Sequence, residues 1–482
     1  MAKARRETLP KSEQGTMSRL REVLKLSLPL SAAQVAQSAM IFCDSIMFGI
    51  LGVEELAGAG LGSAIFNFIL VVISGLLAAV ANEVAFHTGR GAQKDIIRIV
   101  KAGLILVVIV AAMVALAMKV TPALLLGMGQ EPQAVAYASQ YLGQAAWISL
   151  PAFAFMVLRG LAAGMSRTTS IMRISFAAVA LNVPLSYALM TGWRFFPELG
   201  IAGVAIGTAL VSVFMCVMLV LDLNRYAEVR EVLSGLTKIR SRLVDFKPFY
   251  SLGLPIMLAW TMEAGLFTAA TLLAGAMGAV ALAAHQIALQ AASMSFNIYI
   301  GFAQGASIRV GQCYGEGRMG ELKSYAWTGL SLGGLFCLVS ALVFLLLPEQ
   351  IVGLFTLGGE GALDQDVLTL GVSLLAVAAI FQVVDGAQVI MMTALRALRM
   401  GATPTLITVV GYWLVGFPVA WLLKGQWGIV GVWMGLGVGL GFTAICLTTL
   451  FNWRVNRALK GELQKENSTF VTAPTESQLT HN

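Results

Sequence analysis

Long apolar runs separated by short polar segments extend along almost the whole chain. At about 1.5 Å per residue, a helix of roughly 20 apolar residues crosses a hydrocarbon core of about 30 Å. The runs of the first half lie at 23–50, 58–86, 96–118, 134–157, 171–191 and 200–222. The runs of the second half lie at 250–275, 281–308, 325–347, 367–393, 403–423 and 427–452. This pattern predicts an all-α integral membrane protein with twelve transmembrane helices.

The second half of the chain repeats the first. Pro29 in LSLPL and Pro255 in LGLPI are 226 residues apart, and LRGL at Leu158 matches LRAL at Leu395. Both halves hold six runs and begin on the same side, so we expect two six-helix lobes related by a parallel pseudo-two-fold axis. The predicted segments are a cytoplasmic tail (1–22), a first lobe (23–222), a cytoplasmic linker (223–247), a second lobe (248–453) and a cytoplasmic tail (454–482).

Composition and charge agree with this class of protein. Hydrophobic residues make up 58% of the 482 and charged residues 12%, and the mean hydropathy is +0.81. All but three of the 32 Lys and Arg residues fall in segments on one side of the predicted spans. Basic residues concentrate on the cytoplasmic side of membrane proteins, so both termini are predicted to be cytoplasmic. The net charge of +7 then reflects orientation in the lipid bilayer, and we expect no nucleic-acid partner.

Three acidic residues, Asp44, Glu263 and Asp385, lie deep inside apolar runs. An ionisable side chain at the centre of a bilayer costs about 2.5–3.5 kcal/mol on insertion scales, so a bound cation, a proton or a polar neighbour must compensate. These acids are therefore candidates for an ion or substrate site. The alternative is a protonated carboxyl that only holds helices together. Glu83 lies near the inner end of the second run, where we expect it to be hydrated.

Amide and aromatic side chains share helical faces with these acids. Such stripes seldom face lipid, because unpaired amides in hydrocarbon are unfavourable. They either line a cleft between the lobes or join helices, and lining is favoured for the eighth run. The stripes hold Gln34 and Gln37 with Asp44, Phe381, Gln388 and Met392 with Asp385, and Gln286, Gln290, Ser293, Asn297 and Gln304 on the eighth run.

The sign of the buried charge narrows the substrate class. In the twelve-helix arrangement no Lys or Arg maps to mid-membrane depth, so the buried fixed charges are expected to be acidic only. An acidic cavity with amide, Met and aromatic walls suits hydrophobic cations, whereas anionic substrates would leave the acids unpaired.

Catalytic and metal-binding motifs are missing from the sequence. It has no Ser/His/Asp order, H-E-x-x-H or Walker loop, so we expect neither an enzyme nor transport driven by ATP hydrolysis in this chain. The five cysteines show no C-x-x-C spacing, so we expect no disulfide framework and no zinc site. His285 is expected to pack in the protein interior rather than to bind a ligand.

Several segments together resemble the multidrug and toxic compound extrusion (MATE) family, most closely its NorM-like bacterial branch. The resemblance extends from about Leu24 to Phe451. It implies a V-shaped monomer in the bacterial inner membrane that exports cationic or amphipathic compounds in exchange for Na⁺ or H⁺, with no other cofactor. The segments that carry it are LPLSAAQVAQSAMIFCDSIMFG, AAHQIA, ASIRVGQCYGEG and the run from Gln382-Val383-Val384-Asp385 to TALRAL.

The resemblance also implies roles for individual residues. Asp44 matches the acid of the first lobe and Asn182 its amide partner, while Glu263 and Asp385 match a cation-binding pair that is a candidate Na⁺ site. Two positions differ from many relatives, which carry Asn or Asp instead of Ser186 and Tyr instead of Phe381. Further candidates for the cleft or for contact with the acids are Gln34, Gln37, Gln286, Gln290, Asn297, Phe381, Gln382 and Gln388.

Two other functions remain to be weighed against an antiporter. A flippase for lipid-linked oligosaccharides shares this architecture, but its cavity should hold Arg or Lys for the pyrophosphate. A membrane receptor or scaffold that transports nothing would have no need of repeated lobes and buried acids. Uptake driven by a sodium or proton gradient in vesicles separates a transporter from both a receptor and a scaffold.

Overall fold

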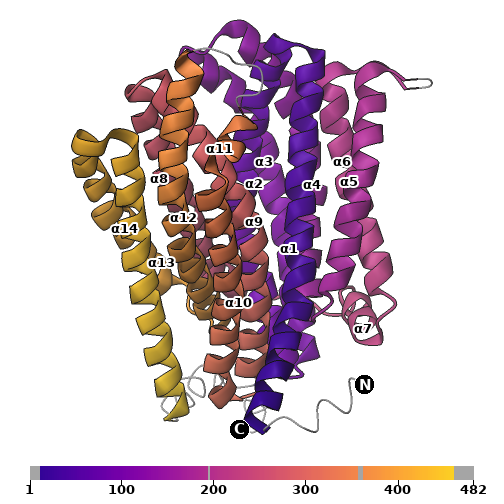
Figure 1. Cartoon of the computed structure of the whole chain (residues 1–482). Helices are drawn as coiled ribbons and strands as arrows, with labels where there is room; N and C mark the ends of the chain where they lie inside the picture. The colour runs from indigo at the N-terminus through magenta and orange to yellow at the C-terminus, as the bar shows by residue number, and fades with distance from the viewer. Residues whose placement is uncertain (1–10, 194–195, 356–361, 461–482) are drawn as a thin grey trace, which may run out of the picture.

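The computed structural model describes residues 11–193, 196–355 and 362–460, and these ranges are almost entirely helical (Figure 1). Residues 1–10 of the predicted N-terminal tail and 461–482 of the predicted C-terminal tail lie outside the described residues. The helices of the first lobe are α1 (Lys11–Leu51), α2 (Val53–Gly89), α3 (Gln93–Gly127), α4 (Pro132–Gly164), α5 (Thr168–Thr191) and α6 (Gly200–Leu223). The predicted linker contains the short helix α7 (Ala227–Gly235) and the 3-10 helix η1 (Leu243–Phe246).

The second lobe repeats this arrangement with more irregular helices. Its elements are the π-helix η2 (Phe249–Gly253), α8 (Leu254–Ala276), α9 (Ala279–Gly315), α10 (Met319–Leu346), α11 (Pro348–Gly353), α12 (Ala362–Ala397), α13 (Ala402–Val409), the π-helix η3 (Val410–Gly416) and α14 (Phe417–Leu459). The described residues contain eleven helices that are long and apolar enough to cross a membrane. The last of them, Ala402–Leu459, has 58 residues and reverses at Gly428, whose φ of 57° and ψ of −135° are not helical. It therefore holds two spans, and the prediction of twelve is confirmed.

Turn glycines show the repeat in the backbone itself. Gly52 (φ 155°) joins α1 to α2, and Gly278 (φ 113°) joins α8 to α9 at the equivalent place. Gly91 (φ 64°) and Gly317 (φ 76°) follow α2 and α9 in the same way. Residues with a side chain rarely adopt these positive φ values, so glycine is required at both copies of each turn.

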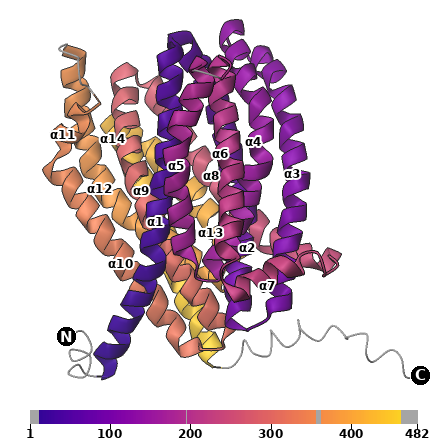
Figure 2. The ribbon, with the colours of Figure 1, turned by 90° about the vertical axis from the view of Figure 1, so that its right-hand side faces the viewer.

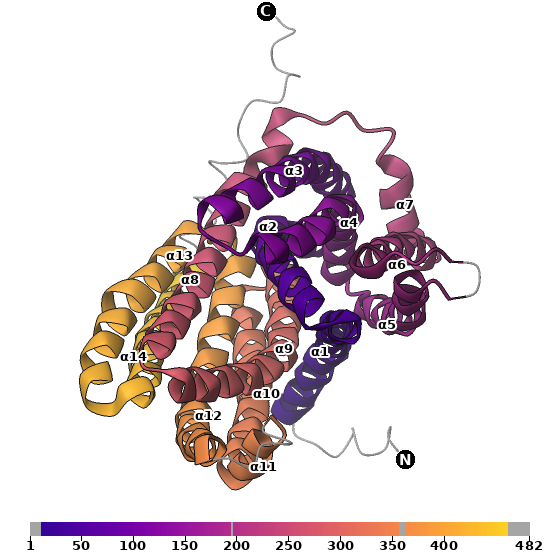
Figure 3. The ribbon, with the colours of Figure 1, turned by 90° about the horizontal axis from the view of Figure 1, so that it is seen from above.

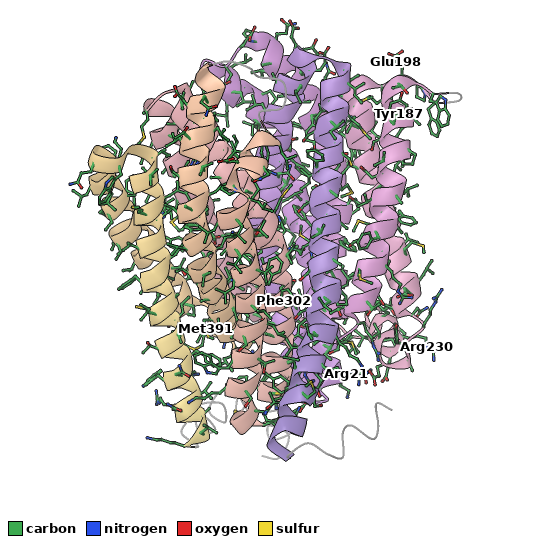
Figure 4. The ribbon with its side chains drawn as sticks, in the orientation of Figure 1. Arg21, Tyr187, Glu198, Arg230, Phe302 and Met391 are labelled. Carbon is green, nitrogen blue, oxygen red and sulfur yellow. The ribbon has the colours of Figure 1, made fainter. Side chains whose placement is uncertain are left out.

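One end of the molecule holds the first turn of α1, the last turn of α14 and the linker helix α7, and it is called the lower end below (Figures 1 and 2). Arg21 and Arg230 lie at this lower end, whereas Tyr187 and Glu198 lie at the upper end (Figure 4). The two lobes lie side by side when seen from above (Figure 3), and their helices spread apart toward the upper end (Figure 1). This gives the V shape that the sequence resemblance implies.

Helices α1 and α9 form the centre of the contact between the lobes. Ser31 Oγ donates a hydrogen bond to the Ile298 carbonyl (2.6 Å), and Ser27 Oγ donates one to the Phe302 carbonyl (3.4 Å). Gly301 of α9 lies so close to the backbone of α1 that a side chain there has no room. Small residues of this kind let two helices in a membrane approach closely.

Most of the other polar contacts between the lobes lie still nearer the lower end. Glu22 of α1 accepts hydrogen bonds from Arg309 of α9 (2.5 Å) and Tyr325 of α10 (2.8 Å). Among the described residues, the hydrogen bonds and ion pairs that join the lobes lie at or below the midpoints of their helices. The lobes are therefore held together from below.

Glu83 is a further part of this lower contact. Its side chain is buried, accepts a hydrogen bond from Arg399 Nε of the second lobe at 2.8 Å and lies 3.4 Å from His87 Nε2. The expectation that Glu83 is hydrated was wrong. The sequence places Glu83 near a helix end, but the second lobe covers that end and supplies a basic partner.

Candidate functional site

Asp44 is the polar centre of the first lobe. Its Oδ2 accepts a hydrogen bond from Thr208 Oγ1 of α6 at 3.0 Å. Asn182 of α5 donates from Nδ2 to the same threonine oxygen (3.4 Å) and to Ser186 Oγ (3.3 Å). Asp44 Oδ1 and Asn182 Oδ1 are buried acceptors that no donor of the described residues reaches. The site therefore offers two unpaired oxygens, one from the Asp44 carboxylate and one from the Asn182 amide, and a proton or a small cation satisfies such a set.

A second acidic site lies inside the other lobe. The buried Asp385 of α12 accepts a hydrogen bond from the hydroxyl of Tyr299 on α9. Glu263 of α8 is half-buried and lies close enough to Asp385 for the two charges to interact. Two carboxylates in a dry site repel each other when both are ionised. A proton or a cation such as Na⁺ between them removes this repulsion, and the oxygen ligands present suit it.

Several predicted site residues lie within the interior of the second lobe. Gln382 Oε1 accepts a hydrogen bond from Ser340 Oγ (3.2 Å), while Gln382 Nε2 and Gln388 Oε1 are buried without a partner among the described residues. The ring of Phe381 packs against Phe267 and Trp433, with centroid distances of 6.2 and 5.3 Å. Phe381 thus belongs to the core of the lobe.

The stripe on α9 does not act as one surface. Gln286 and Gln290 are exposed near its upper end, whereas Asn297 is half-buried and donates to the Ser293 carbonyl at 2.9 Å. Next to this stripe, the buried His285 is paired on both ring nitrogens. Its Nδ1 accepts from Trp433 Nε1 (3.1 Å), and its Nε2 contacts Thr271 Oγ1 (3.0 Å). The expectation that His285 packs in the interior is confirmed.

Two arginines contradict the expectation that buried charges are acidic only. Arg396 of α12 is buried, and its charge interacts with that of Glu263. Arg159 of α4 is half-buried and donates to Gln34 Oε1 (2.6 Å), Gln37 Oε1 (3.1 Å) and Gln304 Oε1 (3.4 Å). Both residues lie near the ends of apolar runs, which is why they were assigned to the membrane surface. Their long side chains instead extend into the protein between helices.

Sequence reasoning also missed two partners of the acids, Thr208 and Tyr299. Each lies in an apolar helix, and neither residue type is unusual there. No pattern in the sequence distinguishes them from other Thr and Tyr residues. The two arginines did leave a signal, because LRGL and LRAL are equivalent in the repeat and place an arginine at the same position of each lobe. Among the described residues there is no cluster of three or more His, Cys, Asp or Glu side chains that would hold a transition metal.

The fold and the site together define a multi-pass membrane protein with two repeated lobes and acids buried inside each lobe, an arrangement typical of secondary transporters. Comparison with solved structures agrees. A multidrug resistance MATE family transporter in an outward-facing conformation superposes with a TM-score of 0.82 at 19% identity, covering 91% of this chain and 96% of that one. A transporter of the MOP superfamily from Pyrococcus furiosus gives the same TM-score, identity and coverage.

Sequence comparison extends the likeness to the family. The MatE family profile matches residues 29–188 and 255–422. The chain is 38% identical over 455 residues to a probable multidrug resistance protein NorM of Pseudomonas aeruginosa, covering 93% of this chain and 92% of that protein. The multidrug resistance protein NorM of Burkholderia vietnamiensis is 32% identical over 438 residues, with coverage of 90% and 94%. The protein belongs to the MatE family and is a membrane transporter, as its resemblance to the NorM-like branch predicted.

Proposed function

We propose that this protein is a multidrug efflux antiporter, which exports cationic or amphipathic compounds in exchange for Na⁺ or H⁺. The observation that carries the proposal is the pair Glu263 and Asp385, two acids from different helices whose charges interact, of which the buried Asp385 also accepts a hydrogen bond from the Tyr299 hydroxyl. The relatives named multidrug resistance protein NorM support the substrate class. No other cofactor is required, and one two-lobed chain is a sufficient transport unit.

Exchange follows from competition for these carboxylates. A proton or Na⁺ bound at Glu263 and Asp385, or at Asp44, neutralises the site that a cationic compound needs in its ionised form. If the ion and the compound favour different arrangements of the lobes, each one shifts the population toward the state that releases the other. Among the described residues, the hydrogen bonds and ion pairs between the lobes lie at or below the helix midpoints, which suits a state open at the upper end.

The positions of basic residues give the orientation of the protein in the membrane. The lower end, which holds Arg21 and Arg230, faces the cytoplasm of a bacterial inner membrane, and the upper end faces outward. Compounds therefore enter from below and leave above. Both chain termini are then cytoplasmic, as the distribution of Lys and Arg predicts.

A flippase for lipid-linked oligosaccharides is less well supported. Arg159 is a basic group of the kind that such a cavity requires, and the sequence had not suggested it. A pyrophosphate carries more charge than one half-buried guanidinium balances, and the acids of both lobes would repel it. We therefore retain the antiporter.

Replacement of the central acid tests the proposal. Everted membrane vesicles with the Asp385→Asn variant should accumulate no ethidium under an imposed gradient, while the variant remains expressed and folded. Asp366→Asn is the matched control, because Asp366 is exposed on the same helix α12. Gradients of Na⁺ and of H⁺ are imposed separately to identify the coupling ion. Undiminished uptake by Asp385→Asn under both gradients would refute the role of this site.

A further inference from the structure

Arg159 has neutral partners only. Its guanidinium donates to three glutamine side chains, Gln34 and Gln37 of α1 and Gln304 of α9. No Asp or Glu oxygen of the described residues lies within 4.0 Å of it. Amide oxygens satisfy hydrogen bonds but do not neutralise the charge, so a partly dry positive charge remains without a counterion.

The three glutamines add donors around this charge. A guanidinium is a donor only, so each glutamine must present its oxygen to Arg159 and direct its NH₂ group elsewhere. None of these three amide nitrogens hydrogen-bonds an acceptor of the described residues, and none is a buried unpaired atom, so all three reach solvent. The cluster of Arg159, Gln34, Gln37 and Gln304 therefore offers free N–H groups around one positive charge. Such a cluster matches an anion.

The two lobes differ in the charges that act on this arginine. Arg159 and Arg396 occupy the same place in the LRGL and LRAL copies. The offset of 226 residues that relates Pro29 to Pro255 also relates Gln37 to Glu263. In the second lobe the charge of Glu263 interacts with that of Arg396, although no Glu263 oxygen lies within 4.0 Å of the guanidinium. In the first lobe the equivalent position holds a glutamine, so the described residues provide no such negative charge for Arg159.

The position of the cluster places it between the lobes. Among the described residues, Ser31 makes the uppermost hydrogen bond between α1 and α9. Gln34 lies about one helical turn above Ser31 on α1. Gln37 lies one turn higher again and seven residues before Asp44. Gln304 belongs to the second lobe, so the cluster joins the two lobes. A bound molecule can thus reach this cluster and an acidic site together.

We propose that the cluster of Arg159, Gln34, Gln37 and Gln304 binds the carboxylate of zwitterionic substrates, while the buried acids bind their cationic part. The proposal rests on the proposed export function and names a substrate class within it. Both Nη2 hydrogens and one Nη1 hydrogen of Arg159 already reach glutamines, so the carboxylate binds through the remaining guanidinium N–H groups and the glutamine NH₂ groups. The contact is charge-assisted, because both groups are charged. Purely cationic compounds do not use the cluster. The expectation that anionic groups are disfavoured throughout the cavity therefore does not hold for this end of it.

A pair of dyes with the same fluorophore tests this inference. One is a zwitterionic rhodamine with a free carboxylate, and the other is its methyl ester, which is only cationic. Wild-type protein in everted vesicles should accumulate both dyes. Arg159→Gln should raise KM for the zwitterion about tenfold or more and leave KM for the ester unchanged, because only the zwitterion loses a charge-assisted contact. Arg159→Lys should recover part of the affinity, because it keeps the charge but places its donors differently from a planar guanidinium.

Ser31→Ala is the matched control, because it removes a contact between the lobes that carries no charge. It should affect the two dyes equally. An equal loss of both dyes in Arg159→Gln would show that Arg159 only joins the lobes, and unchanged kinetics for both would show that the cluster binds nothing. If the wild-type protein transports the ester but not the zwitterion, this inference is overturned and the export function stands. If the wild-type protein transports neither dye, the result would count against the export function itself.

Discussion

The ion pair between Glu83 and Arg399 predicts how strongly the lower end holds the outward-open arrangement. Arg399→Met removes the pair but retains an apolar side chain against the ring of Phe86, over which the guanidinium lies at 4.9 Å from the centroid. Glu83 then keeps only His87, which belongs to its own helix. The substitution thus weakens the contact between the lobes without disturbing either lobe.

The structure sets the size of the effect. Glu83 is 2% exposed, whereas the side chain of Arg399 is 43% exposed. A hydrogen bond to a charged group contributes about 1.5–3 kcal/mol, and the exposure of Arg399 to water reduces that to about 1–2 kcal/mol. Such a change raises the population with an open lower end about five- to thirtyfold.

Distance measurement between the lobes provides the assay. Spin labels on cysteines at Arg230 of α7 and Gly320 of α10 report the separation at the lower end, in a variant whose five native cysteines are replaced. Arg399→Met should add a population at longer distance. Arg98→Met is the control, because it removes a pair with Asp95 at the same end but inside α3. An unchanged distribution in Arg399→Met, or an equal change in the control, would refute the reasoning.

Three further substitutions test single contacts. Thr208→Val removes the donor to Asp44 and should lower dye efflux about tenfold, whereas Thr208→Ser keeps a hydroxyl and should retain wild-type efflux. Equal efflux by both variants would contradict the role of the hydroxyl. Trp433→Phe leaves His285 Nδ1 unpaired and should destabilise the protein by about 1–3 kcal/mol, seen as a lower melting temperature in detergent; an unchanged melting temperature contradicts this. Gly301→Val should lengthen the lower-end spin-label distance, because its side chain overlaps α1; a wild-type distance argues against close packing there.

Much of the fold was predictable because a membrane imposes strong local rules. The hydrocarbon core requires about 20 apolar residues per span, and this requirement acts on each helix separately. The twelve spans, the parallel repeat and the membership of the MATE family were therefore correctly predicted. The sequence also placed Asp44, Glu263 and Asp385 inside helices. A charged residue within an apolar run can be recognised without knowing how the helices pack.

Residue partners depend on how helices pack, and the sequence did not determine them. Thr208 and Tyr299 became partners of acids only because α6 and α9 bring them to α1 and α12. The burial of Glu83 depends on the second lobe, which contributes Arg399 from 316 positions further along the chain. Phe381, which the sequence assigned to the cleft or its surroundings, belongs to an aromatic core.

The sequence by itself determined where the chain crosses the membrane, that it does so in two equivalent halves, and which acids lie in apolar surroundings. Only the tertiary structure decided the direction in which long side chains extend. Arg159 and Arg396 lie near helix ends, and a flexible side chain of their length reaches either water or the space between helices. Neighbouring helices determine which of these happens, and here they turn both arginines inward. The positive charge inside this transporter is therefore a property of helix packing, whereas its helices and its intramembrane acids are properties of the sequence.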